Sequence, residues 1–192
     1  MTIKNKQSKG SNIYQLKITL KDSKPPIWRR LQVKSDITLS KLHQIFQVAM
    51  GWSNTHLHQF IIHGVEYGIP DPDYDTDIKD ERYVKLGKLL VTEGEKFTYE
   101  YDFGDNWEHE ILIEKILPME ISIFYPICIK GKRACPPEDC GGIWGYLDFL
   151  EAIEDISHPE HDEILEWAGG EFNPAAFEVN SINQELKQLG YH

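Results

Sequence analysis

In residues 96–117, KFTYEYDFGDNWEHEILIEKIL, mainly apolar and aromatic side chains alternate with mainly acidic and polar ones. This period-two alternation predicts two β-strands, each with one buried face, joined by a turn at Gly104. The predicted buried face carries Phe97, Tyr99, Tyr101, Trp107, His109, Ile111 and Ile113. The predicted outer face carries Glu100, Asp102, Glu108, Glu110 and Glu114. We expect a positive φ angle at Gly104, because the chain must reverse its direction there.

Upstream of this hairpin, the pattern predicts a second hairpin, a helix and a further strand. IYQLKITL (13–20) and IWRRLQV (27–33) alternate in the same way, and the turn signal DSKPP separates them. Apolar residues then recur at helical spacing, with Thr38 placed to cap the helix and Gly51 placed to end it. HLHQFIIH (56–63) predicts another strand.

Downstream, the pattern changes from strands to helices. IFYPICI (123–129) is strand-like, and GKRACPPEDCGG (131–142) contains too many Pro and Gly residues to be regular. Three helical patterns follow: WGYLDFLEAIEDI (144–156), SHPEHDEILEW (157–167) and a segment that ends as INQELKQLG (182–190). Ser157 and Glu160 have capping-box spacing and are expected to begin the second of these helices.

The order of these elements predicts an α+β fold. We expect a ubiquitin-like β-grasp-type mixed sheet with an added hairpin and a helical C-terminal extension, and a ferredoxin-like sandwich is the alternative. A flexible polar lead over residues 1–12 and a single domain over residues 13–192 complete the expected organisation.

Charge is distributed unevenly along the chain. The formal net charge is −11, yet the first 34 residues carry nine Lys and Arg against one Asp, which leaves −19 for the rest. Most of the surface should therefore repel phosphate polymers. Any nucleic-acid contact should be weak and confined to the basic N-terminal segment, where Trp28 could stack on a base and Arg30 could bind phosphate.

The sequence shows no membrane span and no signal peptide, so we expect an acidic, cytoplasmic protein without a membrane partner.

Two sets of residues are candidate metal ligands. Cys128, Cys135 and Cys140 lie in one loop-rich segment, and His109 could complete a tetrahedral zinc site. Free, partly buried thiols are the alternative for these cysteines, because their spacing lacks a C-x2-C knuckle.

The second set is His56 and His58 with Asp105 and His109. Two histidines spaced by two residues on an extended segment share a face, and the turn carrying Asp102, Asp105 and His109 lies within reach. Imidazole and carboxylate ligands would suit metal-assisted hydrolysis or oxygen chemistry. Histidines that hydrogen-bond to backbone groups are the alternative.

Two loops form the predicted binding surface. YDFGDNWEH (101–109) and EDCGGIWGY (138–146) combine aromatic, glycine and acidic residues, and we expect them to pack together with Trp107 and Trp144 as anchors and Asp105 between them. The sequence has no G-x-S-x-G, G-x-G-x-x-G or Walker pattern. A non-catalytic module that binds an unknown macromolecule and needs no cofactor is therefore our first hypothesis. A metal-dependent enzyme is the second.

Several motifs resemble those of the plasmid pRiA4b ORF-three-like family: IWRRLQV (27–33), LHQIFQVAMGW (42–52) with HLHQF (56–60), YDFGDNWEHEI (101–111), RACPPEDCGGIWGY (133–146) and HPEH (158–161). The resemblance extends from about Ile13 to Leu189. It implies a single compact α+β domain and a link to plasmids or mobile elements, since some members are labelled transposon passenger proteins of a resolvase type. A serine resolvase needs a Ser nucleophile among arginines and a basic helix-turn-helix, and this acidic chain shows neither.

Overall fold

The computed structural model describes residues 11–73 and 77–191, and the predicted polar lead lies almost entirely outside this part. Its elements are β1 (Ile13–Leu20), β2 (Trp28–Lys34), α1 (Leu39–Met50), β3 (His58–Ile62), β4 (Val65–Gly68), β5 (Lys79–Asp80), the 3-10 turn η1 (Glu81–Tyr83), α2 (Leu86–Leu89), β6 (Lys96–Tyr101), β7 (Trp107–Leu117), β8 (Ile127–Lys132), α3 (Gly142–Glu154), α4 (His161–Trp167) and α5 (Val179–Gln188). This mixture confirms the α+β prediction. No helix in the described part is long and apolar enough to cross a membrane.

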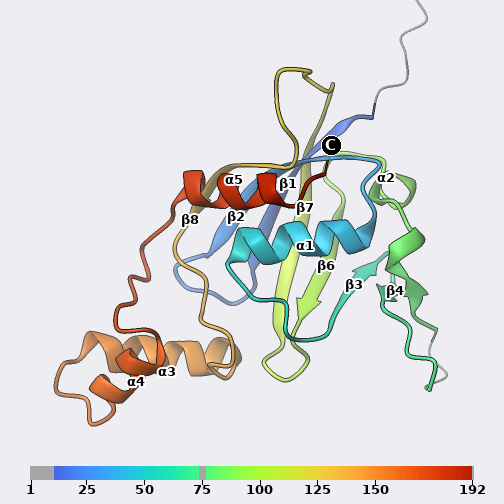
Figure 1. Ribbon diagram of the computed structural model, residues 1–192. Helices are drawn as coiled ribbons and strands as arrows, with labels where there is room; N and C mark the ends of the chain where they lie inside the picture. Colours follow the sequence, from blue (N-terminus) through green and yellow to red (C-terminus); the bar gives the residue numbers. More distant parts are fainter. Residues whose placement is uncertain (1–10, 74–76, 192) are drawn as a thin grey trace, which may run out of the picture.

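The eight strands form one sheet in the order β5-β4-β3-β6-β7-β1-β2-β8. Neighbouring strands are antiparallel, except that β4 and β5 are parallel. Helices α1 and α5 lie across one face of the sheet, whereas α3 and α4 form a separate group beyond one end of it (Figure 1). The β-grasp expectation is not confirmed, since β1 pairs antiparallel with both of its neighbours, β2 and β7.

Helix α1 begins and ends as its sequence predicts. The hydroxyl of Thr38 accepts a hydrogen bond from the Lys41 N–H (3.3 Å), and Gly51 takes a left-handed conformation (φ 86°). Leu42 and Phe46 of this helix are fully buried against the sheet. The ring of Phe46 meets that of Tyr99 edge-on, with centroids 5.2 Å apart.

The two faces of the sheet differ as the alternation predicts. All seven residues predicted for the buried face of β6 and β7 are at most 5% exposed. The outer face instead carries ion pairs between strands, in which Arg30 binds Glu114 through two hydrogen bonds (2.5 and 2.7 Å) and Lys96 binds Glu110 (3.0 Å). One face of the sheet is therefore buried in the hydrophobic core, and the other face is polar.

The edge strand β8 is covered by the C-terminal segment. Asn183 of α5 accepts a hydrogen bond from the Cys128 N–H (2.7 Å) and donates one to the Cys128 carbonyl (2.8 Å). The ring of Phe177 lies against Gly131, where a Cβ atom would come within 2.5 Å of it. Both contacts hold the C-terminal segment against the β8 edge of the sheet.

Two local predictions are wrong. Gly104 is not left-handed; Asp102 (φ 58°) and Asn106 (φ 55°) reverse the chain instead, because Asp and Asn tolerate this conformation through local hydrogen bonds. Ser157 does not cap α4, which begins four residues later, and its hydroxyl donates to Asp155 (2.7 Å).

Candidate functional site

Three segments that are distant in the sequence meet at the end of the sheet nearest α3. They are residues 52–57, the turn between β6 and β7, and the loop 134–141. The indole N–H of Trp52 donates to the Pro136 carbonyl (3.0 Å), and the Gly141 N–H donates to Asp105 (3.2 Å). The two loops predicted to pack together therefore do so.

Gly142 makes this packing possible. It has a positive φ angle (68°), and a Cβ atom there would lie 2.3 Å from the Asp105 carbonyl oxygen. Only glycine lets the two backbones approach so closely. The joint between the turn and α3 is thus specified by the glycine pair of the EDCGG motif.

His56 lies between two carboxylates at this joint. Its Nδ1 atom is 3.6 Å from Asp102 Oδ2, and its Nε2 atom is 3.0 Å from Asp139 Oδ1. Nε2 is buried, and despite this short distance it forms no hydrogen bond, because the geometry of the contact is unsuitable. Ligand atoms of the three residues lie within 4.8 Å of one another, and among the described residues they form the one such group of three or more His, Cys, Asp and Glu.

Glu138 is fixed beside this group by polar side chains. It accepts hydrogen bonds from the Tyr101 hydroxyl (2.5 Å) and from the Ser53 N–H (2.9 Å) and hydroxyl. Burial alone would raise the pKa of Glu138, but the bonds from Ser53 and Tyr101 outweigh it and lower the pKa. Burial and the bond to Glu138 raise the pKa of Tyr101 to about 12, so Tyr101 stays protonated and donates.

The structure does not bring His56 together with the other ligands predicted from the sequence. His58 is buried, binds Glu81 (2.9 Å) and stacks on His43 with ring centroids 3.4 Å apart. His109 is fully buried, with Nδ1 3.3 Å from the Tyr99 carbonyl. Burial lowers the pKa of His109 to about 4. Burial and the neighbouring His58 together lower the pKa of His43 to about 4. These histidines belong to the core.

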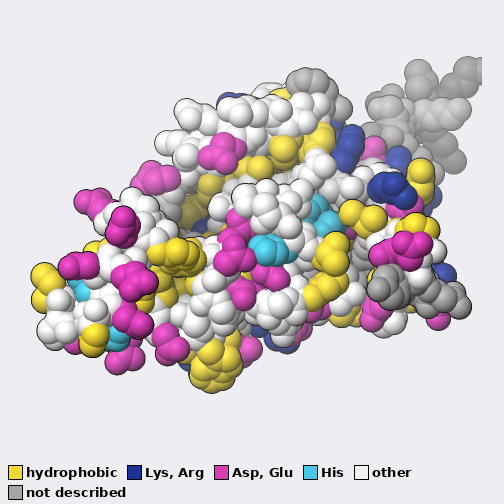
Figure 2. All heavy atoms as spheres, turned by 60° about the horizontal axis from the view of Figure 1, so that its bottom comes forward, with side chains coloured by type: hydrophobic (Ala, Val, Ile, Leu, Met, Phe, Trp, Pro, Cys, Tyr) yellow, Lys and Arg dark blue, Asp and Glu magenta, His cyan; other side chains and the backbone are white. Residues whose placement is uncertain are grey.

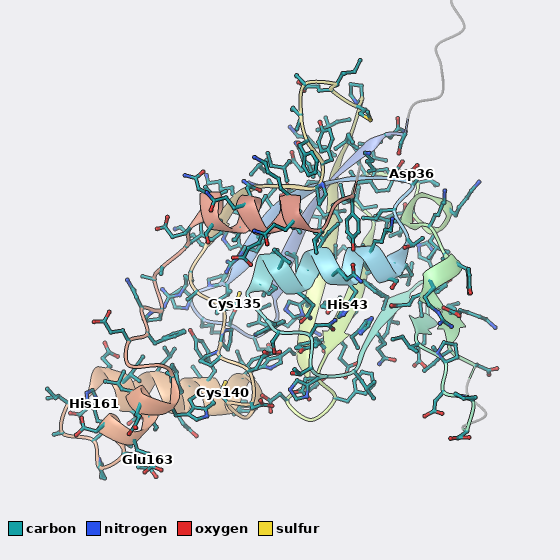
Figure 3. The ribbon with its side chains drawn as sticks, viewed as in Figure 1. Asp36, His43, Cys135, Cys140, His161 and Glu163 are labelled. Carbon is teal, nitrogen blue, oxygen red and sulfur yellow. The ribbon has the colours of Figure 1, made fainter. Side chains whose placement is uncertain are left out.

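The three cysteines are separate too. Cys135 accepts a hydrogen bond from the buried Arg29 (3.0 Å) and contacts the Met50 sulfur at the end of α1, whereas Cys140 lies at the start of α3 (Figure 3). Cys128 contacts the Lys130 carbonyl within β8. Burial raises the pKa of Cys128 and Cys135 to about 11, and burial together with Asp105 and Asp139 raises that of Cys140 to about 12. All three thiols are therefore protonated at neutral pH.

The residues predicted to bind a partner divide into buried and exposed ones. Trp107 is 1% exposed and belongs to the core, whereas Trp144 is 77% exposed on α3. On the outer face, Arg30 lies over the Trp28 ring (5.2 Å to the centroid) while it binds Glu114. Arg30 therefore already has a carboxylate partner, and Lys17 lies over the same Trp28 ring (5.5 Å to the centroid).

A cleft of about 550 Å³ opens between α3, α4 and the segment that joins them. Its acidic lining residues are Asp139, Asp148, Glu151 and Glu160, and its apolar ones include Phe149, Ile164 and Trp167. Figure 2 shows acidic side chains gathered over this part of the molecule, at the left of the view, with hydrophobic side chains between them. The cleft is thus both acidic and apolar, and Asp139 links it to His56.

Comparison with known proteins identifies the family. The model of the family described as plasmid pRiA4b ORF-3-like protein matches residues 12–181. The chain belongs to this family. It is similar to the uncharacterized protein y4hQ of Sinorhizobium fredii, with 40% identity over 93% of each chain. It is also similar to the crystal structure of a protein of unknown function, MM3350 from Methanosarcina mazei Go1, with 38% identity, a TM-score of 0.82, and coverage of 88% of this chain and 97% of that one.

Three motifs that carry the resemblance to the plasmid pRiA4b ORF-3-like family supply this site: HLHQF, YDFGDNWEHEI and RACPPEDCGGIWGY. Sequence reasoning missed Asp139 and the cleft residues Asp148 and Glu151. It placed Asp102 on the outer face by alternation, but the left-handed backbone at Asp102 turns its side chain inward, and the residue is 8% exposed. The acidic run EDC before a glycine pair was the available signal for Asp139.

Proposed function

We propose that this protein is a non-catalytic interaction module that binds a Lys- or Arg-rich, amphipathic segment of another protein in the cleft between α3 and α4. The observation that carries this proposal is the composition of residues 138–171, which we term the acidic lobe. The lobe contains eleven Asp and Glu and no Lys or Arg. The rest of the chain has 20 Asp and Glu and 20 Lys and Arg, so the lobe accounts for the whole formal net charge of −11.

The carboxylates of the cleft are available to a cationic partner. Within the described ranges, Asp148, Glu151 and Glu160 form no ion pair with Lys or Arg. A cationic segment would neutralise their mutual repulsion, and such long-range attraction accelerates association. The same field repels nucleic acids, which disfavours them as occupants.

Exposed apolar side chains favour an amphipathic partner over a purely cationic one. Trp144, Ile156 and Trp167 are 77%, 86% and 51% exposed on the acidic lobe. Trp167 and Phe149 both line the cleft, where their rings pack edge-on (6.1 Å between centroids). Tryptophan in a partly formed apolar pocket is a common source of binding energy at interfaces.

The second candidate function, a metal-dependent enzyme, is favoured by the convergence of His56, Asp102 and Asp139. It ranks below the interaction module because the other two predicted histidine ligands, His58 and His109, are held in the core and do not join this group.

Fluorescence anisotropy with a labelled amphipathic peptide of Lys and Leu tests the proposal. We expect binding that weakens steeply between about 50 and about 300 mM NaCl. The double variant Asp148→Lys/Glu151→Lys should weaken binding at least tenfold, and Trp167→Ala should weaken it several-fold.

The matched control is Glu66→Lys/Glu120→Lys, which makes the same change in net charge at exposed positions outside the acidic lobe. This control should bind the peptide within about twofold of the unmodified protein. If both double variants lose affinity equally, attraction to net charge alone explains the binding and the proposal fails.

A further inference from the structure

We propose that His56, Asp102 and Asp139 bind one divalent transition-metal ion, with zinc the best match, at the joint between the sheet and the acidic lobe. This cation site lies beside the cleft but does not depend on a peptide being bound there. It replaces both ligand sets predicted from the sequence, and it keeps only His56 from them.

The positions of the three donors suit a single ion. Zinc holds N and O ligands at about 2.1 Å, so two ligands of a tetrahedral ion lie about 3.4 Å apart. The observed separations from His56 are 3.6 Å to Asp102 and 3.0 Å to Asp139. Asp102 faces Nδ1 and Asp139 faces Nε2, and an ion binds only one of these nitrogens, so one carboxylate must move towards that nitrogen. The ligand atoms of the three residues lie within 4.8 Å of one another, which keeps this movement local.

Hydrogen bonds hold the carboxylate of Asp102 in place, as such bonds do for the ligands of metal sites. Its Oδ1 atom accepts hydrogen bonds from the N–H groups of Gly104 (2.9 Å) and Asp105 (3.3 Å). These bonds leave Oδ2 directed at His56. The ring of His56 meets that of Tyr101 edge-on (5.8 Å between centroids), which positions the imidazole. Such supporting contacts orient the ligands of metal sites.

The acidic groups at this joint accept hydrogen bonds but have no cationic side chain among the described residues to balance their charge. His56 Nε2 is buried without a hydrogen bond. In the part of the chain that the structure describes, no Lys or Arg pairs with Asp102, Asp105, Glu138 or Asp139. A neutral imidazole and two carboxylates carry a charge of −2, which one divalent cation neutralises.

The donor types select the ion. Imidazole suits zinc, iron, copper and nickel, whereas magnesium and calcium prefer sites built from oxygen alone. Three protein ligands would leave at least one position for water. The competing occupant is a proton on His56, which would offset part of the negative charge of the two carboxylates.

Isothermal titration of chelator-treated protein with zinc chloride tests this proposal, with cobalt chloride and its visible absorption as a second probe. We expect one equivalent of zinc to bind, the melting temperature to rise, and a large excess of magnesium not to compete. His56→Gln and Asp139→Asn should each weaken zinc binding at least tenfold. Asp139 is largely exposed, so Asp139→Asn should fold normally.

Glu66→Gln and His63→Gln are the matched controls, because both residues are exposed and lie outside the group and outside the acidic lobe. Both variants should bind zinc as the unmodified protein does. The proposal is wrong, and a proton on His56 is favoured, if the protein binds no zinc at a zinc concentration of about 1 mM. It is also wrong if His56→Gln and Asp139→Asn bind zinc as tightly as the unmodified protein does. His56→Gln should still bind the Lys/Leu peptide, and Asp148→Lys/Glu151→Lys should still bind zinc, so this proposal and the proposed function can fail separately.

Discussion

The sheet with its covering helices and the acidic lobe differ in charge and in packing. Outside residues 138–171 the cationic and acidic side chains are equal in number, and several of them pair across the outer face of the sheet. The lobe has only acids, and its tryptophans, Trp144 and Trp167, are largely exposed. Balanced charge and buried tryptophans, Trp52 and Trp107, therefore characterise the part that stabilises the fold. Unbalanced charge and exposed tryptophans characterise the part available to a partner.

The largest test of this comparison uses one tryptophan from each region. Trp107→Ala should reduce the free energy of unfolding by about 4 kcal/mol, because a fully buried indole leaves a cavity. Trp144→Ala should change it by less than about 0.5 kcal/mol, because the side chain is exposed. Urea unfolding measures both.

Trp107→Phe separates the two possible causes of a loss at this position. The Trp107 N–H has no hydrogen-bond partner among the described residues, so phenylalanine should recover much of the lost stability. Similar losses for Trp107→Ala and Trp144→Ala would contradict the division into two regions.

The second test concerns the joint between the regions. Gly142→Ala should destabilise the protein by about 3 kcal/mol, because a Cβ atom would overlap the Asp105 carbonyl in a left-handed backbone. Gly51→Ala is the matched control, since Gly51 is also left-handed (φ 86°) but has open space around it. We expect a loss of about 1 kcal/mol there, from backbone strain alone. Equal losses in thermal and urea unfolding would show that the close approach at Gly142 is unimportant.

The third test uses pH to probe the core. Burial lowers the pKa of His109 from 6.5 to about 4, so the unfolded chain takes up a proton at a higher pH than the folded protein does. Stability should therefore be complete above about pH 6.5 and decrease as the pH falls towards 4, with a loss of about 2 kcal/mol from His109 by pH 5. His43 should add a loss of the same sign.

Urea unfolding at pH 7 and pH 5 measures this dependence. His109→Leu should make it weaker, whereas His63→Gln, at an exposed position, should leave it unchanged. A pH dependence that is the same in all three proteins would assign the titration to other groups.

The sequence predicted the elements of the fold better than it predicted the site. Alternation identified every buried residue of β6 and β7, and Thr38 and Gly51 correctly bounded α1, because these signals are local. His56 and His58 were placed together by the same rule, yet β3 begins only at His58 and their partners differ.

The remaining errors have one physical cause. Asp139 reaches His56, and Gly142 packs on Asp105, only after segments far apart in the chain have come together. A local sequence pattern gives no information about contacts between segments that are far apart in the chain. Left-handed residues such as Asp102 also reverse the side-chain alternation on which the sequence reading depends.

The amide side chain of Asn183 also bears on self-association. By bonding to both backbone groups of Cys128, it occupies hydrogen-bonding positions that β8 would otherwise offer to a strand of another molecule. The opposite edge, β5, has only two residues and offers little to pair with. Because α5 follows β8 in the chain, a growing polypeptide would form this edge before its cover exists. The time between formation of the β8 edge and docking of residues 179–188 therefore sets how long this edge can pair with another molecule.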